Sequence, residues 1–225
     1  MDDYEKTLRY IIKKYDLHTW KAKLPIEIPD TDRVTLANLF DELGFTKGVE
    51  IGVEEGKYSK VLCHTNKNLK LYCVDPWLAF DVYRKHLDQE YVDNLMNNAL
   101  VRLKGYNVEI VRKTSMDAVK DFEDNSLDFV YIDGNHRLEY VVNDLAGWTR
   151  KVRVGGIISG HDWVRMAYSS EKKWHDPMQV TYAVRAFTDA YKISPWFLLG
   201  TYGVTPGQKR EKMRSYFWVK GPDRY

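Results

Sequence analysis

Three features that often decide what a protein does are scarce in this sequence of 225 residues: cysteine, long apolar runs and an excess of one charge. Its two cysteines, Cys63 and Cys73, lie beside apolar residues, which argues against a disulfide framework and predicts two reduced thiols in a core. No segment approaches the roughly 20 apolar residues that a membrane span needs. The net charge of +2 gives no general attraction to nucleic acid or to a membrane surface.

The start of the chain also lacks the basic residues and apolar centre of a secretion signal. Together with the reduced cysteines, this predicts a cytoplasmic protein without a membrane partner. The length suits one α/β domain with a short addition. We expect a helical N-terminal extension over residues 1–33 and a single domain over residues 34–225. The sequence leaves open whether the chain forms a homo-oligomer.

The order of apolar patterns predicts the fold class. Helical spacing occupies residues 4–15 and 34–43, and strand patterns follow at residues 48–51, 69–74, 108–111, 127–132, 156–159, 196–199 and 215–219. Helical patterns at residues 58–64, 83–103, 115–122 and 138–152 separate the first five strands, which is typical of parallel strands joined by crossover helices. A turn-rich connection joins the last two strands and favours a hairpin. We therefore predict a Rossmann-like α/β fold with a seven-stranded, mostly parallel sheet, its last strand antiparallel and helices on both faces.

The first strand of this sheet ends in an acidic residue and a glycine turn. Glu50 stands where the dinucleotide fingerprint G-x-G-x-x-G has its first glycine, and Gly52 and Gly56 follow. A carboxylate at that position disfavours a diphosphate, and with it an NAD-dependent dehydrogenase, but suits a ligand that carries an ammonium group. Glycines let a ligand approach the main chain, and the next helix points its N–H groups at it. A purely structural turn would have the same glycines.

The ends of the next two strands add polar residues at the same edge of the sheet. The second strand ends in Asp75-Pro76-Trp77, and an acidic residue at this distance from the glycine turn is a candidate ligand for ribose hydroxyls. An aspartate in a simple Asp-Pro turn is the alternative. The third strand is followed by Thr114, Ser115 and Met116, which either cap the next helix or line the pocket.

The fourth and fifth strands end in the most polar segments of the core. One terminates in Asp133-Gly134-Asn135-His136, and the other in Gly160-His161-Asp162. Carboxylates and imidazoles are rare inside a core unless they are paired or bound to a ligand. Because the carboxyl ends of parallel strands lie at one edge, we expect these groups to meet.

Taken in order, these motifs resemble those of class I S-adenosylmethionine (SAM)-dependent methyltransferases of the methyltransferase domain 24 branch. That branch has an Ile-Asp-Gly-x-His segment and a Gly-Gly-x-x-x-x-His-Asp segment in the corresponding places, and Val180, Ala183, Val184 and Phe187 repeat its next helix. The resemblance implies a SAM-dependent methyltransferase, with Asp133 beside the methionine part of the cofactor. The candidate cofactor-binding residues are Glu50, Ile51, Gly52, Gly56, Asp75, Pro76, Trp77, Thr114, Ser115, Met116 and Asp133.

The resemblance also raises the question of a divalent metal. Related catechol-type and sugar O-methyltransferases hold one with carboxylates at these two strand ends, which implies Asp133, His161 and Asp162 as candidate ligands of Mg²⁺ or Mn²⁺. Oxygen ligands favour such hard cations, whereas an imidazole favours a transition metal. His161 stands where an acidic or amide residue is often found, so the sequence leaves metal dependence open.

The expected reaction is methyl transfer to a small-molecule acceptor, with a hydroxyl as the favoured group. His161 or His136 is the candidate general base, because a neutral histidine takes a proton near pH 7. An equally weighted alternative for His136 is to hold Asp133 in place. The loop from Trp163 to Asp176 is long and aromatic, and it predicts a substrate lid.

Two other functions compete with this one. A SAM-binding partner module without catalysis would not need the polar residues at the two strand ends. A nucleic-acid methyltransferase is suggested by the basic residues Lys209, Arg210, Lys212 and Arg214. No wider basic and aromatic stripe extends them, so a solvated hairpin face is the favoured interpretation and nucleic acid is not expected as a partner.

Overall fold

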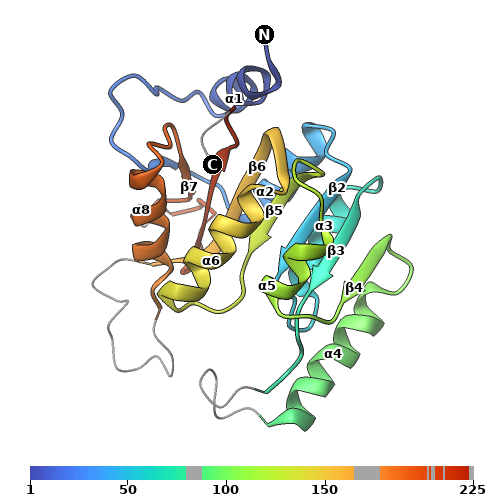
Figure 1. Ribbon diagram of the computed structural model, residues 1–225. Coiled ribbons are helices and arrows are strands. Elements are labelled where there is room, and N and C mark those ends of the chain that lie inside the picture. The colour runs from blue at the N-terminus through green and yellow to red at the C-terminus, as the bar shows by residue number, and fades with distance from the viewer. Residues whose placement is uncertain (80–87, 165–177, 202, 204–205, 210, 223–225) are drawn as a thin grey trace.

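The structure is a computed structural model that describes residues 1–79, 88–164, 178–201, 203, 206–209 and 211–222. Its centre is one eight-stranded sheet with the strand order β1-β7-β8-β6-β5-β2-β3-β4 (Figure 1). The strands are β1 (Ile26–Ile28), β2 (Lys47–Ile51), β3 (Lys70–Val74), β4 (Val108–Val111), β5 (Leu127–Ile132), β6 (Val152–Trp163), β7 (Phe197–Leu199) and β8 (Arg214–Val219). β8 is antiparallel to both of its neighbours, and the other neighbouring strands are parallel.

Helices cover both faces of this sheet. One face carries α1 (Asp3–Lys14), α2 (Arg33–Glu42), α3 (Lys57–Thr65) and α4 (Gln89–Leu103), and the other carries α5 (Ser115–Ala118), α6 (Leu138–Thr149) and α8 (Val180–Ala190), with a 3₁₀ turn at Val119–Asp121. β5 separates the two cores: Phe129 and Tyr131 enter the first, whereas Val130 and Ile132 enter the second. This alternation is the period of two that a strand buried on both faces requires.

The order of the strands reverses at the middle of the sheet. From β2 the chain moves outward to β3 and β4, and it then returns to the other side of β2 to form β5 and β6. The segments that follow β2 and β5 therefore diverge, which leaves a crevice at the carboxyl ends of these strands. The fold thus places the predicted polar strand ends around one point.

The N-terminal extension contributes a strand as well as a helix. α1 packs against β6, where the Thr7 hydroxyl donates to the Gly155 carbonyl oxygen at 2.8 Å. β1 then pairs in parallel with β7. The sequence did not predict β1, because three residues between two prolines are too few to show strand periodicity. The fold class is confirmed with one strand more than expected, and the boundary at residue 33 stays a prediction.

The other predicted elements lie close to their expected places. α4 is described from Gln89, and the predicted start of this helix at residues 83–87 falls outside the described residues. The predicted helix at residues 138–152 ends at Thr149, because Val152 already begins β6. Of the predicted lid, Trp163 instead ends β6, where it is only 1% exposed and packs against Trp196; residues 165–176 lie outside the described residues.

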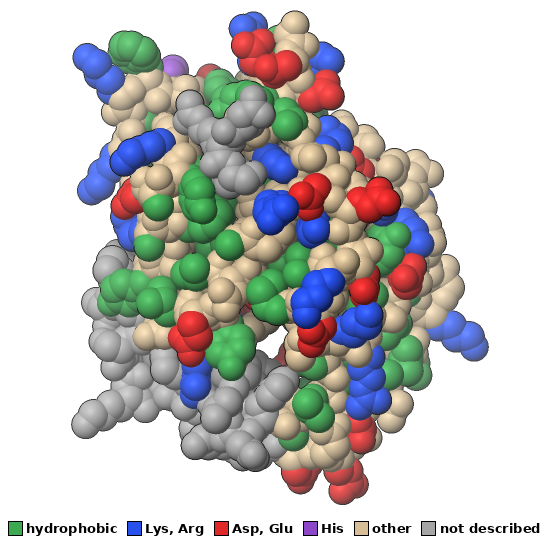
Figure 2. Space-filling view, in the orientation of Figure 1, with side chains coloured by type: hydrophobic (Ala, Val, Ile, Leu, Met, Phe, Trp, Pro, Cys, Tyr) green, Lys and Arg blue, Asp and Glu red, His purple; other side chains and the backbone are tan. Residues whose placement is uncertain are grey.

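Charges of both signs are mixed on one face of the molecule. Figure 2 shows side chains of both signs interspersed on the visible face without a broad area of one sign, in keeping with the small net charge. None of the helices in the described ranges is both long and apolar enough to cross a membrane.

Candidate functional site

A cavity of about 750 Å³ opens at the carboxyl ends of β2, β3, β5 and β6. This volume lies in the usual range for a small-molecule or cofactor site. With the exception of Gly56, every predicted cofactor-binding residue lines it: Glu50, Ile51, Gly52, Asp75, Pro76, Trp77, Thr114, Ser115, Met116 and Asp133. The structure therefore brings the four predicted motifs together in one chamber.

The two glycines of the turn have different roles. Gly52 has φ of 86°, and a Cβ there would lie 2.1 Å from the Asp133 carbonyl oxygen, so glycine is needed where the ends of β2 and β5 touch. Gly56 has φ of 73° and caps α3, and its Cβ would point at Leu103 of α4. The structural alternative therefore describes Gly56 better than direct contact with a cofactor does.

Glu50 is a buried carboxyl group at the floor of the cavity. It is only 2% exposed and accepts a short hydrogen bond from the Ser59 hydroxyl. Burial raises the pKa of Glu50 to about 8, although the Ser59 hydrogen bond opposes this rise. A cation that entered the cavity beside it would favour the ionised form. Glu50 thus fits a ligand with an ammonium group.

Asp75 organises the glycine turn from the end of β3. Its Oδ2 accepts hydrogen bonds from the main-chain N–H groups of Val53 and Glu54, both at 3.0 Å, and its Oδ1 accepts one from Trp77 at 2.8 Å. Burial raises the pKa of Asp75 although these hydrogen bonds oppose the rise. A carboxylate accepts about four hydrogen bonds, so capacity remains for a hydroxyl group from the cavity.

The third polar turn contains a buried carboxyl group that the sequence did not single out. Ser115 donates a short hydrogen bond to Asp144 and accepts one from the Trp148 indole N–H at 2.8 Å. Burial raises the pKa of Asp144 to about 7, and this side chain also lines the cavity. Asp144 lies within a helical pattern in the sequence, so only its burial reveals it. Thr114 both caps α5 and lines the cavity, which satisfies both predictions for it.

The ends of β5 and β6 bring two carboxylates and an imidazole together. One ligand atom from each of Asp133, His136 and Asp162 lies within 4.8 Å of the others. His136 Nε2 lies 2.7 Å from Asp162 Oδ2 and 3.9 Å from Asp133 Oδ1. All three residues line the cavity. We call this set the Asp-His-Asp cluster.

His161, the histidine of the predicted metal set, lies behind this cluster and not in the cavity lining. Its Nδ1 is 3.4 Å from Asp162 Oδ1 and 3.8 Å from Asp133 Oδ2, and its buried Nε2 has no hydrogen-bond partner within the described part of the chain. Burial alone would lower the pKa of His161, but its contacts with Asp162 and Asp133 raise it overall. The compact set therefore contains His136, whereas the sequence analysis predicted His161 as its histidine.

The two carboxyl groups of the cluster differ in charge preference. Burial raises the pKa of Asp133, and the nearby Asp162 raises it further. Burial would also raise the pKa of Asp162, but the two histidines hold it well below its ordinary value. Negative charge is therefore concentrated on Asp162, whose contact with His161 helps to raise the pKa of that histidine.

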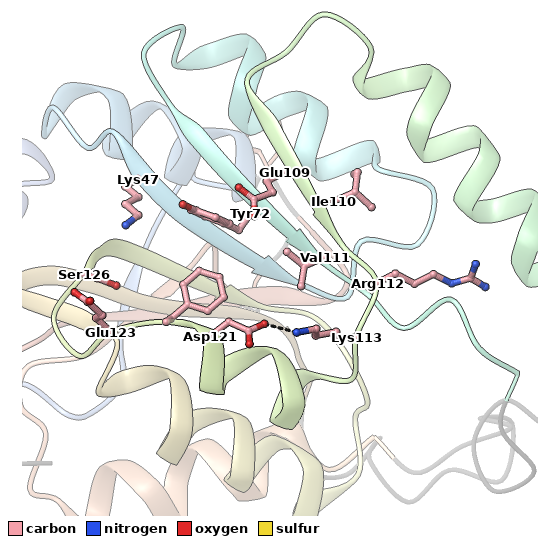
Figure 3. Close-up of a pocket in the computed structure, with 11 residues that line it drawn as sticks. Lys47, Tyr72, Glu109, Ile110, Val111, Arg112, Lys113, Asp121, Glu123 and Ser126 are labelled. Carbon is pink, nitrogen blue, oxygen red and sulfur yellow. Dashed lines mark hydrogen bonds and ion pairs between the residues drawn. The ribbon is translucent and has the colours of Figure 1, made fainter.

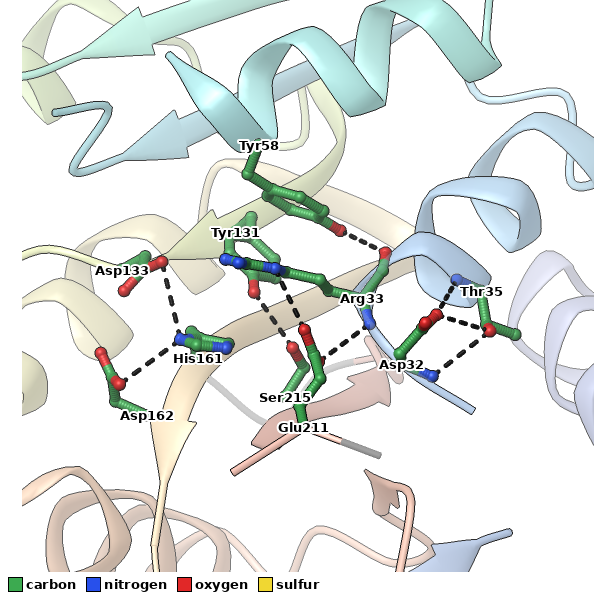
Figure 4. A network of polar contacts seen from close by, with 10 residues as sticks. All are labelled: Asp32, Arg33, Thr35, Tyr58, Tyr131, Asp133, His161, Asp162, Glu211 and Ser215. Carbon is green, nitrogen blue, oxygen red and sulfur yellow. Dashed lines mark hydrogen bonds and ion pairs between the residues drawn. The ribbon is translucent and has the colours of Figure 1, made fainter. Parts of the chain in front are cut away.

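Arg33 and Glu211, which lie on either side of the central strands in the sequence, form a second polar group beside the cluster (Figure 4). The Arg33 guanidinium Nε lies 3.1 Å from Glu211 Oε1, and the Arg33 main-chain N–H donates to Glu211 Oε2 at 3.0 Å. Arg33 also lines the cavity. Neither residue was predicted for the site, because Arg33 belongs to the presumed extension and Glu211 to the last connection.

A second cavity, of about 540 Å³, lies beside the edge strand β4 and is shown in Figure 3. Lys113 and Asp121 of its lining pair with each other at 2.6 Å, and Glu109 and Arg112 pair with Lys70 and Asp93 beyond it. None of the predicted site residues lines it. The cavity at the switch point is therefore the candidate functional site.

A comparison with protein families agrees with this geometry. The sequence model of a methyltransferase domain, the family methyltransferase 24, matches residues 49–163, which is just over half of the chain. The chain belongs to this methyltransferase domain family. The matched segment spans the glycine turn, Asp75, Ser115 and the Asp-His-Asp cluster, so this SAM-dependent methyltransferase carries most of its candidate site inside the family's own segment.

Individual relatives of this methyltransferase are distant. An uncharacterized protein of Acanthamoeba polyphaga mimivirus, R132, is 28% identical over 180 residues, which cover 77% of this chain and 75% of that protein. An O-methyltransferase of Bacillus cereus, solved with S-adenosylhomocysteine (SAH), has a TM-score of 0.54 at 16% identity, over 98% of this chain and 92% of that one. The N-methyltransferase NodS of Bradyrhizobium japonicum has a TM-score of 0.56 at 11% identity, over 84% and 94%. These structures share the fold.

The buried Glu50 predicts a specific dependence of stability on pH. Since its pKa is about 8 when folded and 4.5 in its ordinary state, the folded chain holds a proton that the unfolded chain loses in this interval. The contribution is thus fully present below pH 4.5 and is lost as the pH rises through 8. From pH 5 to 8 the free energy of unfolding should fall by an amount on the order of 4 kcal/mol in the unliganded protein.

Urea unfolding of the wild type, Glu50→Gln and the surface control Glu109→Gln at both pH values measures this contribution. Glu50→Gln should lose less stability between the two pH values than the wild type, whereas Glu109→Gln should follow the wild type. Parallel pH profiles for all three proteins would show that Glu50 ionises normally.

Proposed function

We propose that this protein transfers a methyl group from SAM to a hydroxyl group of a small molecule. The observation that supports this most directly is the shared cavity: Glu50 and Asp75 line it together with the Asp-His-Asp cluster. Residues suited to a cofactor with an ammonium group and a ribose thus face residues suited to proton transfer. A binding module without catalysis has no use for the second set.

The cavity fits SAM in chemistry as well as in volume. SAM supplies an electrophilic methyl group when it is bound. In this proposal Asp75 accepts hydrogen bonds from the ribose hydroxyls, and Ser115 and Met116 lie at the adenine end of the cavity. Glu50 and Asp133 bring acidic groups to the end that receives the sulfonium and the ammonium. The protein's main contribution is alignment, because an in-line displacement depends on the approach of the two reacting atoms.

His136 is the candidate base for the hydroxyl proton. When neutral with its proton on Nε2, it donates a hydrogen bond to Asp162 Oδ2 at 2.7 Å, and Asp162 remains ionised. In this tautomer Nδ1 carries the lone pair that takes the proton of the acceptor hydroxyl, as in other histidine bases that a carboxylate orients. His161 sits behind Asp133 and Asp162 and positions them from outside the cavity. The two candidate bases of the sequence therefore take different roles in this proposal.

The Asp-His-Asp cluster also fits a divalent metal. Ligand atoms at roughly 2.0–2.6 Å from an ion lie within about 5 Å of one another, and the three ligand atoms meet this condition within 4.8 Å. Two carboxylates with one imidazole suit Mn²⁺ better than Mg²⁺. Asp133, His136 and Asp162 would hold the ion, which would lower the pKa of the acceptor hydroxyl.

Nucleic acid is less well supported as the acceptor. Arg214, one of the four basic residues in the last connection, is 2% exposed and pairs with Glu27 at 2.8 Å. Lys209 is exposed, and Arg210 lies outside the described residues. The four residues therefore do not form one exposed basic patch.

Cofactor binding is tested first. Calorimetric titration with SAH should show binding by the wild type, and Glu50→Ala and Asp75→Ala should each weaken it by roughly tenfold or more, because each removes a carboxyl group that contacts the cofactor in this proposal. Asp93→Ala is the matched control, since its carboxylate pairs with Arg112 outside the cavity. A folded wild type that does not bind SAH would contradict the proposal.

The acceptor class is tested by SAH formation from SAM with catechol, simple phenols and sugar alcohols. Hydroxyl compounds should support turnover, whereas the same compounds with the hydroxyl already methylated should not. His136→Ala should lower the turnover by roughly 10²–10⁴-fold, because it removes the general base. An unchanged rate in this variant would remove His136 from the mechanism.

Metal binding is tested with Mn²⁺ alone, followed by electron paramagnetic resonance of the free ion. His136→Ala and Asp162→Asn should abolish binding, and His161→Ala should retain most of it. Retained Mn²⁺ binding in His136→Ala and its loss in His161→Ala would favour the metal ligands predicted from the sequence, Asp133, His161 and Asp162. Wild-type protein that does not take up Mn²⁺ would leave the Asp-His-Asp cluster as a proton relay only.

A further inference from the structure

The cavity contains a positive group that the proposed chemistry has not used. Among its described lining residues, Arg33 and Lys57 are the ones with permanently cationic side chains. Lys57 is 71% exposed in its side chain and pairs closely with Glu55, so solvent and a partner satisfy it. The Arg33 side chain is less exposed, at 38%, and comes from the start of α2, outside the segment that defines the family.

Arg33 is held through its main chain and through one part of its side chain. Glu211 forms an ion pair with the Arg33 Nε at 3.1 Å and accepts a hydrogen bond from the Arg33 main-chain N–H, and the Tyr58 hydroxyl donates to the Arg33 carbonyl oxygen at 2.9 Å. The guanidinium carbon lies 5.5 Å from the centre of the Tyr58 ring, a distance at which the ring attracts a cation. Figure 4 shows the side chain passing beside this ring with its terminal nitrogens directed to the side of Asp133.

These terminal nitrogens retain hydrogen-bonding capacity. A guanidinium has five N–H donors, and Nε–H is the one that faces Glu211. Within the described residues, neither Nη1 nor Nη2 has a hydrogen bond to the protein. A planar fork of donors at the wall of a cavity matches the geometry of a carboxylate.

The position of Arg33 indicates which carboxylate it receives. Asp75 and Ser115 follow β3 and β4, so the nucleoside end of the cavity lies on that side of the switch point. Glu50 lies near the end of β2 and Asp133 follows β5, and Arg33 approaches from beyond them, beside His161 and Glu211. A cofactor that extends from Asp75 past Glu50 reaches Arg33 with its amino-acid end.

We infer that Arg33 binds the α-carboxylate of the methionine part of SAM, and that Glu211 positions the guanidinium for this contact. This inference rests on the proposed SAM site and adds a contact from each flank of the family segment. Glu50 and Arg33 then face the ammonium and the carboxylate of the same amino acid. A carboxylate on the acceptor is the other source of the same chemistry, and the experiment separates the two.

The test compares two ligands that differ only at the amino-acid end. SAH carries the carboxylate, whereas 5′-methylthioadenosine keeps the nucleoside and the thioether but lacks the amino acid. Calorimetric dissociation constants for both are measured with the wild type, Arg33→Gln, Arg33→Lys and Lys57→Gln. Arg33→Gln keeps the main-chain contacts to Glu211 and Tyr58, so its fold should be retained, as its thermal unfolding midpoint would show.

Arg33→Gln should weaken SAH binding by roughly ten- to a hundredfold and leave methylthioadenosine binding within about twofold. The SAH affinity of Arg33→Lys should lie between those of the wild type and Arg33→Gln, because lysine keeps the positive charge but loses the planar pair of donors. Lys57→Gln, which removes the same charge from the same cavity, should bind both ligands like the wild type. Glu211→Gln should weaken SAH binding by a smaller factor than Arg33→Gln and again spare methylthioadenosine.

Any other pattern of SAH and methylthioadenosine binding by these variants overturns the inference. Equal loss of both ligands in Arg33→Gln would make Arg33 a structural residue of the cavity wall. Unchanged binding of both would assign the guanidinium to the acceptor or to neither substrate. A folded wild type that binds neither ligand would instead overturn the proposed SAM site itself, which is a separate failure.

Discussion

The burial of carboxyl groups around one crevice is the constraint on which the rest of this structure depends. Glu50, Asp144 and Asp162 lose most of their hydration where the parallel strands and the helix that follows β5 meet. Burying an unpaired negative charge is costly, so each group keeps its proton or finds a partner. Glu50 and Asp144 take the first course, with pKa values raised to about 8 and about 7, and Asp162 takes the second through its two histidines. A ligand with a positive charge at one end reduces the cost of ionising a buried carboxyl group beside it. A buried group such as Glu50, which is costly to the fold without a ligand, therefore suits a cationic cofactor.

Much of this arrangement could be predicted from the sequence, because it follows from strand ends. A core strand that ends in Asp75, Asp133 or Asp162 delivers the carboxylate to the carboxyl edge of a parallel sheet, whatever the details of packing. The alternation of apolar residues and the crossover helices then determine the fold class. The glycine turn could also be predicted from the sequence. In the structure its two glycines have different roles, because Gly52 allows the ends of two strands to touch and Gly56 packs against α4.

The remaining site residues could not be predicted, for identifiable physical reasons. Asp144 occupies a helical pattern and shows its role only through burial against Ser115. The exchange of His161 for His136 depends on local backbone geometry, since Asp162 adopts a positive φ of 60° that periodicity does not reveal. Arg33 and Glu211 meet only because β1 and β8 bring both flanks of the chain to the sheet. The predicted role of the aromatic connection after Trp163 stays a prediction, because it falls mainly on residues that the structure does not describe.

The contact between Arg33 and Glu211 joins residues that are 178 positions apart in the chain. Local opening of proteins begins at their ends, where few contacts hold the backbone. In this chain the two flanks meet at the wall of the cavity, so fraying of either one disturbs the site before the central strands separate. A ligand that bridges the cavity to Arg33 would therefore act as a clasp, and it would slow hydrogen exchange and proteolysis at both flanks together, far from the atoms that react.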